Sequence, residues 1–435
     1  MGSAHLEIVD GSAILNGLIH SSRISVLAVL AAFSGSASAA EALTWQSCVE
    51  LTARQNPEVR SARETYSAAV EQVGVARSSF LPQADGSLTY ANGESNNNAA
   101  THTYNASIAV SQNLFNGLID KARLEQARYA SESAQESLIS ARSKVSYDLR
   151  AAFEGMSNAK DYRQLTGDII DRRASNLKLV SLRFDSGREN KGSVMLSQAY
   201  LEQARYDDLQ ARNNLVSART QLARTLGRDD DDAVDVQGHV PTNEPPASAP
   251  DYRALVQATP DFKRALANEA SSEAGVTVAR GGFFPTLGLS GTAGKQGESW
   301  FPDTQRWTLG VTLGIPLFSG GSSYYATRSA RENYRASAST RENSGRQLQS
   351  DLTVAFNSYV EAVAKLKVDD SFQKAAEVRA NIARNKYNNG LLSFDDWDII
   401  ENDLINRQKS YLQSRLARVV AEAAWERAQG KGVIP

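Results

Sequence analysis

The sequence has little of what most catalytic and metal sites are built from. Its 435 residues include one cysteine, Cys48, so a single chain can form neither an internal disulfide nor a cysteine metal cluster. The four histidines are His5, His20, His102 and His239, which fall in the N-terminal stretch, at an expected hairpin tip and in a linker. Histidines scattered in this way argue against a metal or catalytic site. We therefore expect no cofactor and no enzymatic activity.

The chain also lacks an excess of charge of either sign. Lys and Arg total 47 against 49 Asp and Glu, a net charge of −2, so the composition offers no basic surface for nucleic acid. The sequence also contains no glycine-rich phosphate loop and no nucleophile constellation. These absences favour a passive role over catalysis, so any energy would have to come from a partner.

The apolar run near the N-terminus is too short to cross a membrane. Ile24 to Phe33 follows Arg23, whereas a helix needs about 20 apolar residues to span the hydrocarbon layer. Small residues come next, and Ala37-Ser38-Ala39 fits a signal-peptidase site. We therefore predict a signal peptide at residues 1–40 and export of the mature chain.

Two-faced strands are the clearest local pattern in the mature chain. In residues 104–117, every second position is apolar (Tyr104, Ala106, Ile108, Val110), with small or polar residues between. Such alternation predicts a β-strand with two different faces, and residues 307–318 repeat it. Aromatic residues stand at both ends of each stretch, as in strands that cross an outer-membrane bilayer. We predict that four of them form membrane girdles: Tyr104, Phe115, Trp307 and Phe318.

Proline marks the entry to each predicted hairpin. Phe80-Leu81-Pro82 and Phe283-Phe284-Pro285 end helical stretches, because proline lacks the N–H that a helix needs and restricts the residue before it. Pro82 and Pro285 are therefore predicted helix-to-strand stops. The hairpins are expected at 83–116 and 286–319.

After the first hairpin the hydrophobic period changes to steps of three and four, which is typical of a coiled-coil-like helix. About 45 residues from Ile119 would make a rod of about 68 Å. A break near 160–167 is expected to turn the chain back. Helix then resumes at Ile169, is interrupted at Arg183-Phe184-Asp185-Ser186-Gly187, and continues to Leu226.

The whole pattern occurs twice. A shift of 203 positions places residues 56–227 on 259–430 without a gap, so that Pro57 meets Pro260 and Gly227 meets Gly430. An ungapped match of this length predicts an internal duplication in which both halves share one fold. The expected organisation is a first repeat at 41–228, an acidic and proline-rich linker at 229–250, a second repeat at 251–430 and a tail at 431–435.

Four strands per chain cannot close a membrane sheet. Open edges in lipid leave unpaired backbone groups that cost several kcal/mol each, and closed barrels begin at about eight strands. Copies of the chain must therefore share one barrel. Two copies would leave an interior filled by side chains, whereas three would supply twelve strands and room for a lumen.

These features together resemble the TolC family of outer-membrane efflux proteins. The resemblance is carried by the leader, the duplication, both Phe-x-Pro stops, both Leu-Phe-x-Gly strand ends and both Arg/Lys-Phe/Tyr-x-x-Gly breaks. It covers nearly all of the mature chain. It implies a mixed α+β membrane protein, a homotrimer with a shared twelve-stranded β-barrel in the outer membrane of a Gram-negative bacterium, standing on a periplasmic α-barrel of long coiled-coil-like helices.

The resemblance also implies a function. The chain would be the passive exit duct of a tripartite efflux or type I secretion system. It would open by docking to a periplasmic adaptor protein that links it to an inner-membrane pump or ABC exporter. Its other partner would be outer-membrane lipid.

The second break resembles the periplasmic constriction of the family. Tyr387-x-x-Gly390 is followed by Asp395, Asp396 and Asp398, and Asp396 falls at the position of the first constricting aspartate. A ring of carboxylates around one axis would attract cations and repel anions. The alternative is that these aspartates are a solvated helix start with Ser393 as N-cap. Three positions expected to be polar or acidic partners of the gate hold Leu392, Ile399 and Ser193, so the family's gate-locking bonds are not present residue for residue.

The two glycine breaks resemble the grooves in which adaptor hairpins dock. The residues concerned are Phe184, Ser186 and Gly187 in the first repeat and Gly390 and Leu391 in the second. The alternative is simple punctuation of the helices by glycine, and both can hold together.

Two functions from other classes were weighed against a channel. A periplasmic coiled-coil scaffold that never enters the membrane is the first, and the two-faced strands with aromatic ends argue against it. A secreted hydrolase is the second, and it would need a carboxylate or histidine cluster that the sequence does not show.

Overall fold

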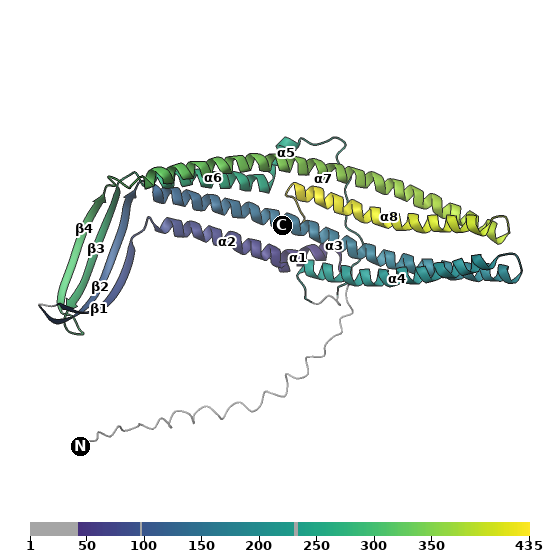
Figure 1. Cartoon of the computed structure of the whole chain (residues 1–435), viewed down its shortest axis with the longest axis horizontal. Helices are drawn as coiled ribbons and strands as arrows, with labels where there is room; N and C mark the ends of the chain where they lie inside the picture. The colour runs from purple at the N-terminus through teal and green to yellow at the C-terminus, as the bar shows by residue number, and fades with distance from the viewer. Residues whose placement is uncertain (1–41, 96–97, 230–233) are drawn as a thin grey trace, which may run out of the picture. The chain divides into compact units, whose positions relative to one another are not determined.

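The computed structural model describes residues 42–95, 98–229 and 234–435 (Figure 1). The predicted signal peptide and most of the acidic run at the start of the linker lie outside these residues. The helices are α1 (Trp45–Gln55), α2 (Pro57–Ser78), α3 (Ile119–Asp185), α4 (Lys191–Leu226), α5 (Tyr252–Ala258), α6 (Pro260–Gly281), α7 (Ser322–Asn388) and α8 (Phe394–Ala428). The strands are β1 (Gln83–Ser95), β2 (Asn98–Asn116), β3 (Thr286–Gly297) and β4 (Thr304–Gly314).

The four strands form one antiparallel sheet in the order β1-β2-β3-β4, side by side in Figure 1. The two hairpins meet in the middle, where Tyr104 of β2 lies opposite Gly297 of β3 and Ile108 lies opposite Ala293. Within this chain β1 and β4 each pair on one side only. The sheet therefore has two open edges, one from each repeat.

The strand register sorts the side chains onto two faces, as the alternation predicts. The apolar face carries Leu88, Tyr90, Tyr104, Ile108, Val110, Leu289, Trp307, Leu309, Val311 and Leu313. The polar face carries Asp85, Ser87, Thr89, Asn105, Ser107, Ser111, Ser290, Thr292, Gln296, Arg306, Thr308 and Thr312. Most of the large apolar side chains are solvent-exposed in the isolated chain, so the apolar face needs a non-aqueous neighbour.

The hairpin bounds differ between the repeats. The first hairpin runs from Gln83 to Asn116, which matches the predicted range. In the second, β4 ends at Gly314 rather than at residue 319. Pro316 explains the early end, because it has no N–H to donate and constrains the residue before it. Phe318 therefore lies in the connection to α7.

The predicted break near 160–167 is wrong. Helix α3 is continuous over 67 residues, which is about 100 Å. The Thr166 hydroxyl donates to the Arg163 carbonyl oxygen and to Asp208 of α4, at 2.9 and 3.1 Å. One helical turn after Thr166, Ile169 packs against Ala204 of α4 and Ile405 of α8. Packing against the neighbouring helices thus carries the helix through a stretch with weak periodicity.

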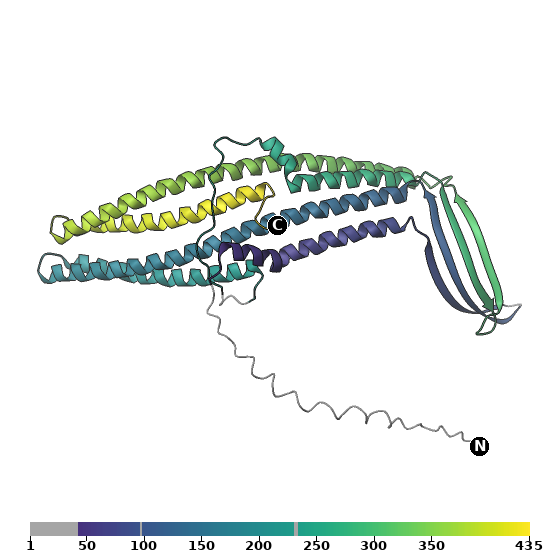
Figure 2. The same cartoon turned by 180° about the vertical axis from the view of Figure 1, so that it is seen from behind.

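The helices pack in two sets, which both views show (Figures 1 and 2). Toward the strands, α2 contacts α3, α3 contacts α6, and α6 contacts α7. Toward the helix turns, α4 contacts α3, α3 contacts α8, and α8 contacts α7. The long helices α3 and α7 belong to both sets, so each repeat keeps its own side of the molecule.

The duplication is visible residue by residue. The first residues of α2, α3 and α4 are 57, 119 and 191, and those of α6, α7 and α8 are 260, 322 and 394, so each pair differs by 203. Helices α3 and α7 are both 67 residues long. Glycines with positive φ also recur at matching positions, at Gly187 and Gly390 and at Gly227 and Gly430.

Each repeat has an apolar core near the middle of its long helix. In the first, Leu149, Phe153 and Met156 of α3 pack with Cys48 of α1 and with Val236 of the linker. Burial raises the pKa of the Cys48 thiol to about 11, in keeping with a packing role. In the second, Leu352 and Phe356 of α7 pack with Trp425 of α8.

The linker is bound to both repeats. The backbone N–H of Val240 donates to Glu154 of α3 at 3.2 Å, and that of Asn243 donates to Glu422 of α8 at 3.0 Å. Both carboxylates are buried. Because a buried carboxylate without partners is costly, these bonds fix the course of the linker across the two repeats.

Replacement of Gly227 by alanine should destabilise the fold. Its φ of +76° is left-handed, and a new Cβ would lie 2.5 Å from the Gln55 carbonyl oxygen. We expect a loss of at least about 2 kcal/mol, seen as a lower thermal midpoint of helical circular dichroism. Gly167→Ala is the matched control, since open space surrounds that helical position and a gain of about 1 kcal/mol is expected there. Equal melting of the two variants would contradict this account.

Candidate functional site

The candidate site is the pair of helix turns, α3–α4 and α7–α8. After α3, the N–H of Gly187 donates to the Phe184 carbonyl and that of Arg188 to the Arg183 carbonyl, both at 2.8 Å. Gly390 and Leu391 repeat the pattern after α7, at 3.0 and 2.9 Å. This is the glycine C-cap that satisfies the last helical carbonyls, and it needs positive φ at the glycine. Termination of the two helices is thus sufficient to explain both glycines.

Tyr387 holds the two turns together. Its buried phenol donates to Glu189 of the first turn at 2.9 Å. Arg183 donates from Nη1 to the Tyr387 carbonyl oxygen at 2.6 Å, and its guanidinium lies 4.5 Å from the centre of the Tyr387 ring. Trp397 stacks on the other side with ring centroids 4.3 Å apart. The tyrosine is therefore clamped between the two repeats.

Electrostatics at Tyr387 favour the neutral phenol. Burial, and then the hydrogen bond to Glu189, raise the pKa of Tyr387 well above its usual range. The phenol therefore stays protonated and continues to donate to the carboxylate across the physiological pH range.

Sequence reasoning missed Glu189. The acidic partner in the first repeat was expected at position 193, but Ser193 only donates its hydroxyl to Glu189, at 3.0 Å. The position equivalent to Glu189 in the second repeat holds Leu392, 203 residues later. Neighbouring positions differ in the same way, with Arg188 opposite Leu391 and Lys191 opposite Phe394, so the sequence alone does not single out Glu189.

The three aspartates of the second turn lie in different environments. Asp395 and Asp396 are exposed at the start of α8. Ser393 caps this helix, because its hydroxyl oxygen accepts from the Asp396 N–H at 3.1 Å, while the hydroxyl donates to the Asp396 carboxylate at 2.7 Å. Both carboxylates therefore stand at the positive end of the helix dipole and remain open to solvent.

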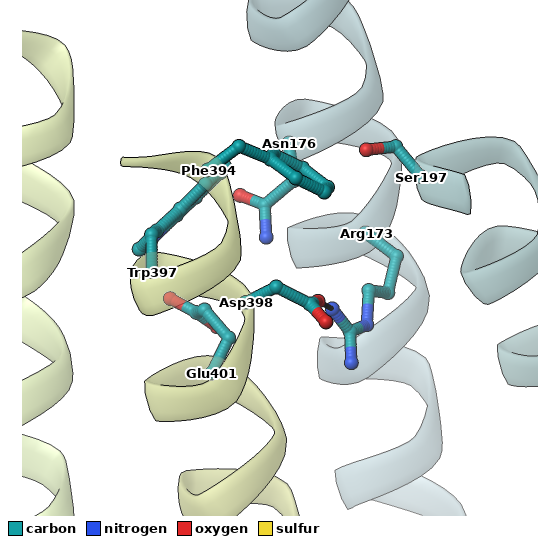
Figure 3. Close-up of a pocket in the computed structure, with 7 residues that line it drawn as sticks. All are labelled: Arg173, Asn176, Ser197, Phe394, Trp397, Asp398 and Glu401. Atoms are coloured by element: carbon teal, nitrogen blue, oxygen red, sulfur yellow. Dashed lines mark hydrogen bonds and ion pairs between the residues drawn. The ribbon is translucent and has the colours of Figure 1, made fainter. Parts of the chain in front are cut away.

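Asp398 faces inward, toward the first repeat (Figure 3). Its carboxylate lies 3.4 Å from Arg173 of α3, and the two side chains are only 12% and 8% exposed. Arg173 also donates to Asn402 and lies over the Tyr200 ring at 4.6 Å. Asp398 is thus engaged inside the chain, as is Tyr387, whereas Asp395 and Asp396 remain exposed.

More ion pairs follow the contact between α3 and α8. Arg150 lies 3.0 Å from Glu426, and Arg415 of α8 pairs with Asp161 of α3. At the turns, Arg384 of α7 pairs with buried Glu401 of α8 at 2.9 Å. Ion pairs between α3 and α8 therefore link the two repeats well away from the turns, while the Arg384–Glu401 pair joins α7 to α8 within the second repeat.

The predicted docking residues lie at the surface of the turns. Phe184, Ser186, Gly187, Gly390 and Leu391 are all exposed. The structure brings the two sets together, since Glu189 and Tyr387 join the turns that carry them.

Of the predicted girdle residues, Tyr104 and Phe115 lie on β2 and Trp307 on β4, whereas Phe318 lies in the connection to α7. Tyr104 and Phe115 on β2 are 11 residues apart, about 37 Å along a strand at 3.4 Å per residue. At the tilt of about 40° found in membrane barrels this becomes about 28 Å, close to the height of their apolar band. Trp307 and Phe318 are highly exposed. Pro82 and Pro285 stand directly before β1 and β3.

Within the described ranges, no group of three or more His, Cys, Asp and Glu side chains is placed to hold a metal ion. None of the described helices combines the length and apolar composition needed to cross a membrane.

Comparison with known families gives two matches along this chain. The family described as outer membrane efflux protein matches residues 49–228 and again residues 252–431. The chain belongs to this outer membrane efflux protein family. The two matches coincide with the two repeats. Membership places the protein in the outer membrane, with its helices in the periplasm, and makes it an exit channel.

The chain is also similar to two individual proteins. Outer membrane protein TolC of Escherichia coli K12 is 22% identical over 358 residues, covering 77% of this chain and 71% of that protein. Alkaline protease secretion protein AprF of Pseudomonas aeruginosa is 23% identical over 351 residues, covering 73% and 70%.

Solved structures share the fold at lower identity. The outer-membrane channel OprN has a TM-score of 0.79 and 19% identity, covering 90% of this chain and 91% of that one. The Campylobacter jejuni CmeC outer membrane channel has a TM-score of 0.80 and 17% identity, covering 89% and 86%. The observed arrangement of strands and long helices is thus that of the efflux family.

Loss of Arg173 should weaken the fold near the turns. Arg173→Met leaves the Asp398 carboxylate nearly buried without its cation, and breaking such a pair costs about 3–5 kcal/mol. We expect a lower unfolding midpoint, measured by Trp397 fluorescence during thermal melting. Arg205→Met is the matched control, because Arg205 pairs with Glu202 at an exposed site, where pairs contribute about 0–1 kcal/mol. Similar midpoints for both variants would show that the Arg173 pair is not needed.

Proposed function

We propose that three copies of this chain close into one channel that carries substrates out of the periplasm and across the outer membrane. The observation that carries the proposal is the sheet with its two open edges, β1 and β4. In lipid, the unpaired N–H and C=O groups of these edges must find partners. Pairing β4 of one copy with β1 of the next satisfies them, and three copies give twelve strands.

The helices support the same closure. In the set toward the strands, the outermost helices are α2 of the first repeat and α7 of the second. In the set toward the turns, they are α4 of the first repeat and α7 of the second. The edges of the sheet follow the same division, with β1 from the first repeat and β4 from the second. One rotation that joins β4 to β1 can therefore also join α7 to α2 and α4, as a closed heterologous ring requires.

Apolar side chains stand exposed on these outer helices. On α4 they are Met195, Leu196, Tyr206, Leu209 and Val216, and on α7 they include Val354, Val368, Phe372, Val378 and Ile382. A single chain leaves them in water, whereas neighbouring copies would cover them. Their burial would contribute about 1.5–3 kcal/mol for each large side chain fully covered.

The polar face of the sheet would then line the lumen. Its hydroxyl, amide and glycine positions suit a water-filled passage, while the apolar face meets lipid. Charge on the lumen side is sparse, with Asp85 and Arg306 as its charged residues among the paired positions. Selection by charge would therefore take place at the periplasmic end.

We infer that Asp395 and Asp396 form the acidic constriction there. Their exposure and position at the helix start support this role, and three copies would bring six carboxylates around one axis. Asp398 does not join them in this proposal, because Arg173 already neutralises it. Tyr387 acts as a positioning residue, since it ties the α7–α8 turn to Glu189 of the first repeat.

The adaptor would act on these same turns. A periplasmic adaptor protein docking on Phe184, Ser186, Gly187, Gly390 and Leu391 would compete with the Tyr387 clamp and separate the turns. The energy would come from an inner-membrane pump or ABC exporter, as for a passive duct. AprF is named for protease secretion, so type I secretion stands beside small-molecule efflux as the use of this channel.

Charge removal at the constriction should change ion selectivity. The double variant Asp395→Asn with Asp396→Asn should lose most of its preference for cations and its block by multivalent cations, because six carboxylates leave the axis. Single-channel recording in planar bilayers measures both. Asp398→Asn is the control, and its selectivity should match the unmodified channel. Unchanged selectivity in the double variant would remove the acidic ring from the proposal.

Assembly should depend on the outer helices. The purified protein in detergent should have three times the mass of one chain, measured by light scattering after size exclusion. Leu209→Asp on α4 and Phe372→Asp on α7 should each shift the protein toward single chains, because each places a charge in the proposed contact. A monodisperse single chain in the unmodified protein would refute the shared barrel.

A further inference from the structure

A groove lies on the apolar face of the sheet, under the β3–β4 connection. Its volume is about 720 Å³, within the range of small-molecule sites. Its walls are made largely of small or apolar residues from three strands and the connection: Gly86, Leu88, Ala106, Ile108, Ala293, Phe301 and Pro302. Ser87, Ser107, Gly294 and Lys295 complete the lining.

The connection between β3 and β4 folds back over the apolar face. Trp300 packs edge-on against Tyr104 with ring centroids 5.6 Å apart. Pro302 lies so close to Gly297 that a Cβ at Gly297 would meet it at 3.1 Å. Trp300 and Phe301 are nevertheless 72% and 83% exposed. Because they continue the lipid-facing surface of the sheet, lipid is the environment that would cover them.

Lys295 lies at the rim of this groove and places a charge on a face that is otherwise mostly apolar. It pairs with Ala106 of β2 and Gln305 of β4, two residues from the level of Tyr104. Its ammonium forms no ion pair or hydrogen bond within the described ranges. The nearby Arg306 points to the opposite, polar face and donates to Gln296 at 2.9 Å. A lysine on a lipid-facing surface extends to the headgroup region and seeks an anion there.

We propose that this groove is a lipid-binding site, in which an acyl chain lies along Gly86, Ala106 and Ala293 beneath Phe301 and the phosphate of the same lipid binds Lys295. The ligand class is an anionic phospholipid or phosphorylated glycolipid. The site lies on the body of the sheet rather than along the unpaired side of β4. It is therefore compatible with pairing between copies.

The inference rests on the proposed channel only in that the apolar face must lie in the membrane. A second copy of the chain is the other possible occupant of this surface. It would bury Trp300 against protein instead of lipid, and the experiment below separates the two.

The test uses Trp300 as a reporter in the full-length protein reconstituted in vesicles. Trp307→Phe is introduced as the background, so that Trp300 is the tryptophan on the apolar face, since Trp45, Trp397 and Trp425 belong to helices. Quenching by brominated phosphatidylglycerol is compared with quenching by brominated phosphatidylcholine. We expect the anionic lipid to bind about fivefold more tightly at this position.

Three further variants decide which part of the site matters. Lys295→Gln should abolish the preference for the anionic lipid, and Ala106→Leu should weaken quenching by filling the groove. Arg306→Gln is the matched control, because it removes a cation from the opposite face and should leave the preference unchanged. Circular dichroism confirms that each variant keeps its fold.

Several outcomes would overturn the site. Equal quenching by both lipids, or a preference that survives Lys295→Gln, would remove the lysine contact. Normal quenching in Ala106→Leu would reduce the site to a headgroup contact outside the groove. Absence of quenching by either lipid would place Trp300 against protein and would count against a membrane-facing sheet as well.

Discussion

The structure depends on one requirement, that backbone hydrogen-bonding groups in lipid must be paired. A four-stranded sheet leaves two edges open, and the described part of the chain offers no further strand to pair with them. The first repeat supplies one edge of the sheet and of the helix layer, and the second repeat supplies the other edge of both. The duplication thus makes a chain with two unpaired edges, and the edge from one repeat can pair with the edge from the other repeat in a neighbouring copy.

The two repeats are joined by contacts that differ from those inside them. Within a repeat, the long helices meet around an apolar core. Between the repeats, near the turns, the contacts are the Arg173–Asp398 ion pair, the clamped Tyr387 and an apolar cluster that includes Val180 of α3 and Trp397 of α8, while the linker binds two buried glutamates further along the helices. Separating the turns would therefore expose this apolar cluster together with a nearly buried ion pair.

Much of the fold could be predicted from local patterns. Alternation around Tyr104 identified the strands, Pro82 and Pro285 marked their starts, and the shift of 203 positions gave the duplication. The expected helix break near 160–167 failed because Thr166 and Ile169 are held by residues of α4 and α8 that are distant in sequence. The early end of β4 was readable in Pro316 and was overlooked.

The candidate site was predictable only in part, for the same physical reason. Helix capping placed Asp395 and Asp396 at an exposed helix start, which needs only local information. The partner of Asp398 is Arg173, on another helix 225 residues earlier, and the partner of Tyr387 is Glu189. Such pairs depend on how two rods lie side by side, and periodicity does not specify which polar residues then meet.

The equal length of α3 and α7 carries a consequence for the evolution of this chain. Both rods hold 67 residues and must keep their turns level for Tyr387 to reach Glu189. Lengthening one rod alone would slide one turn past the other by 1.5 Å per added residue. The reach of such a channel can therefore change only by matched insertions in all four long helices, in multiples that restore the same helical face.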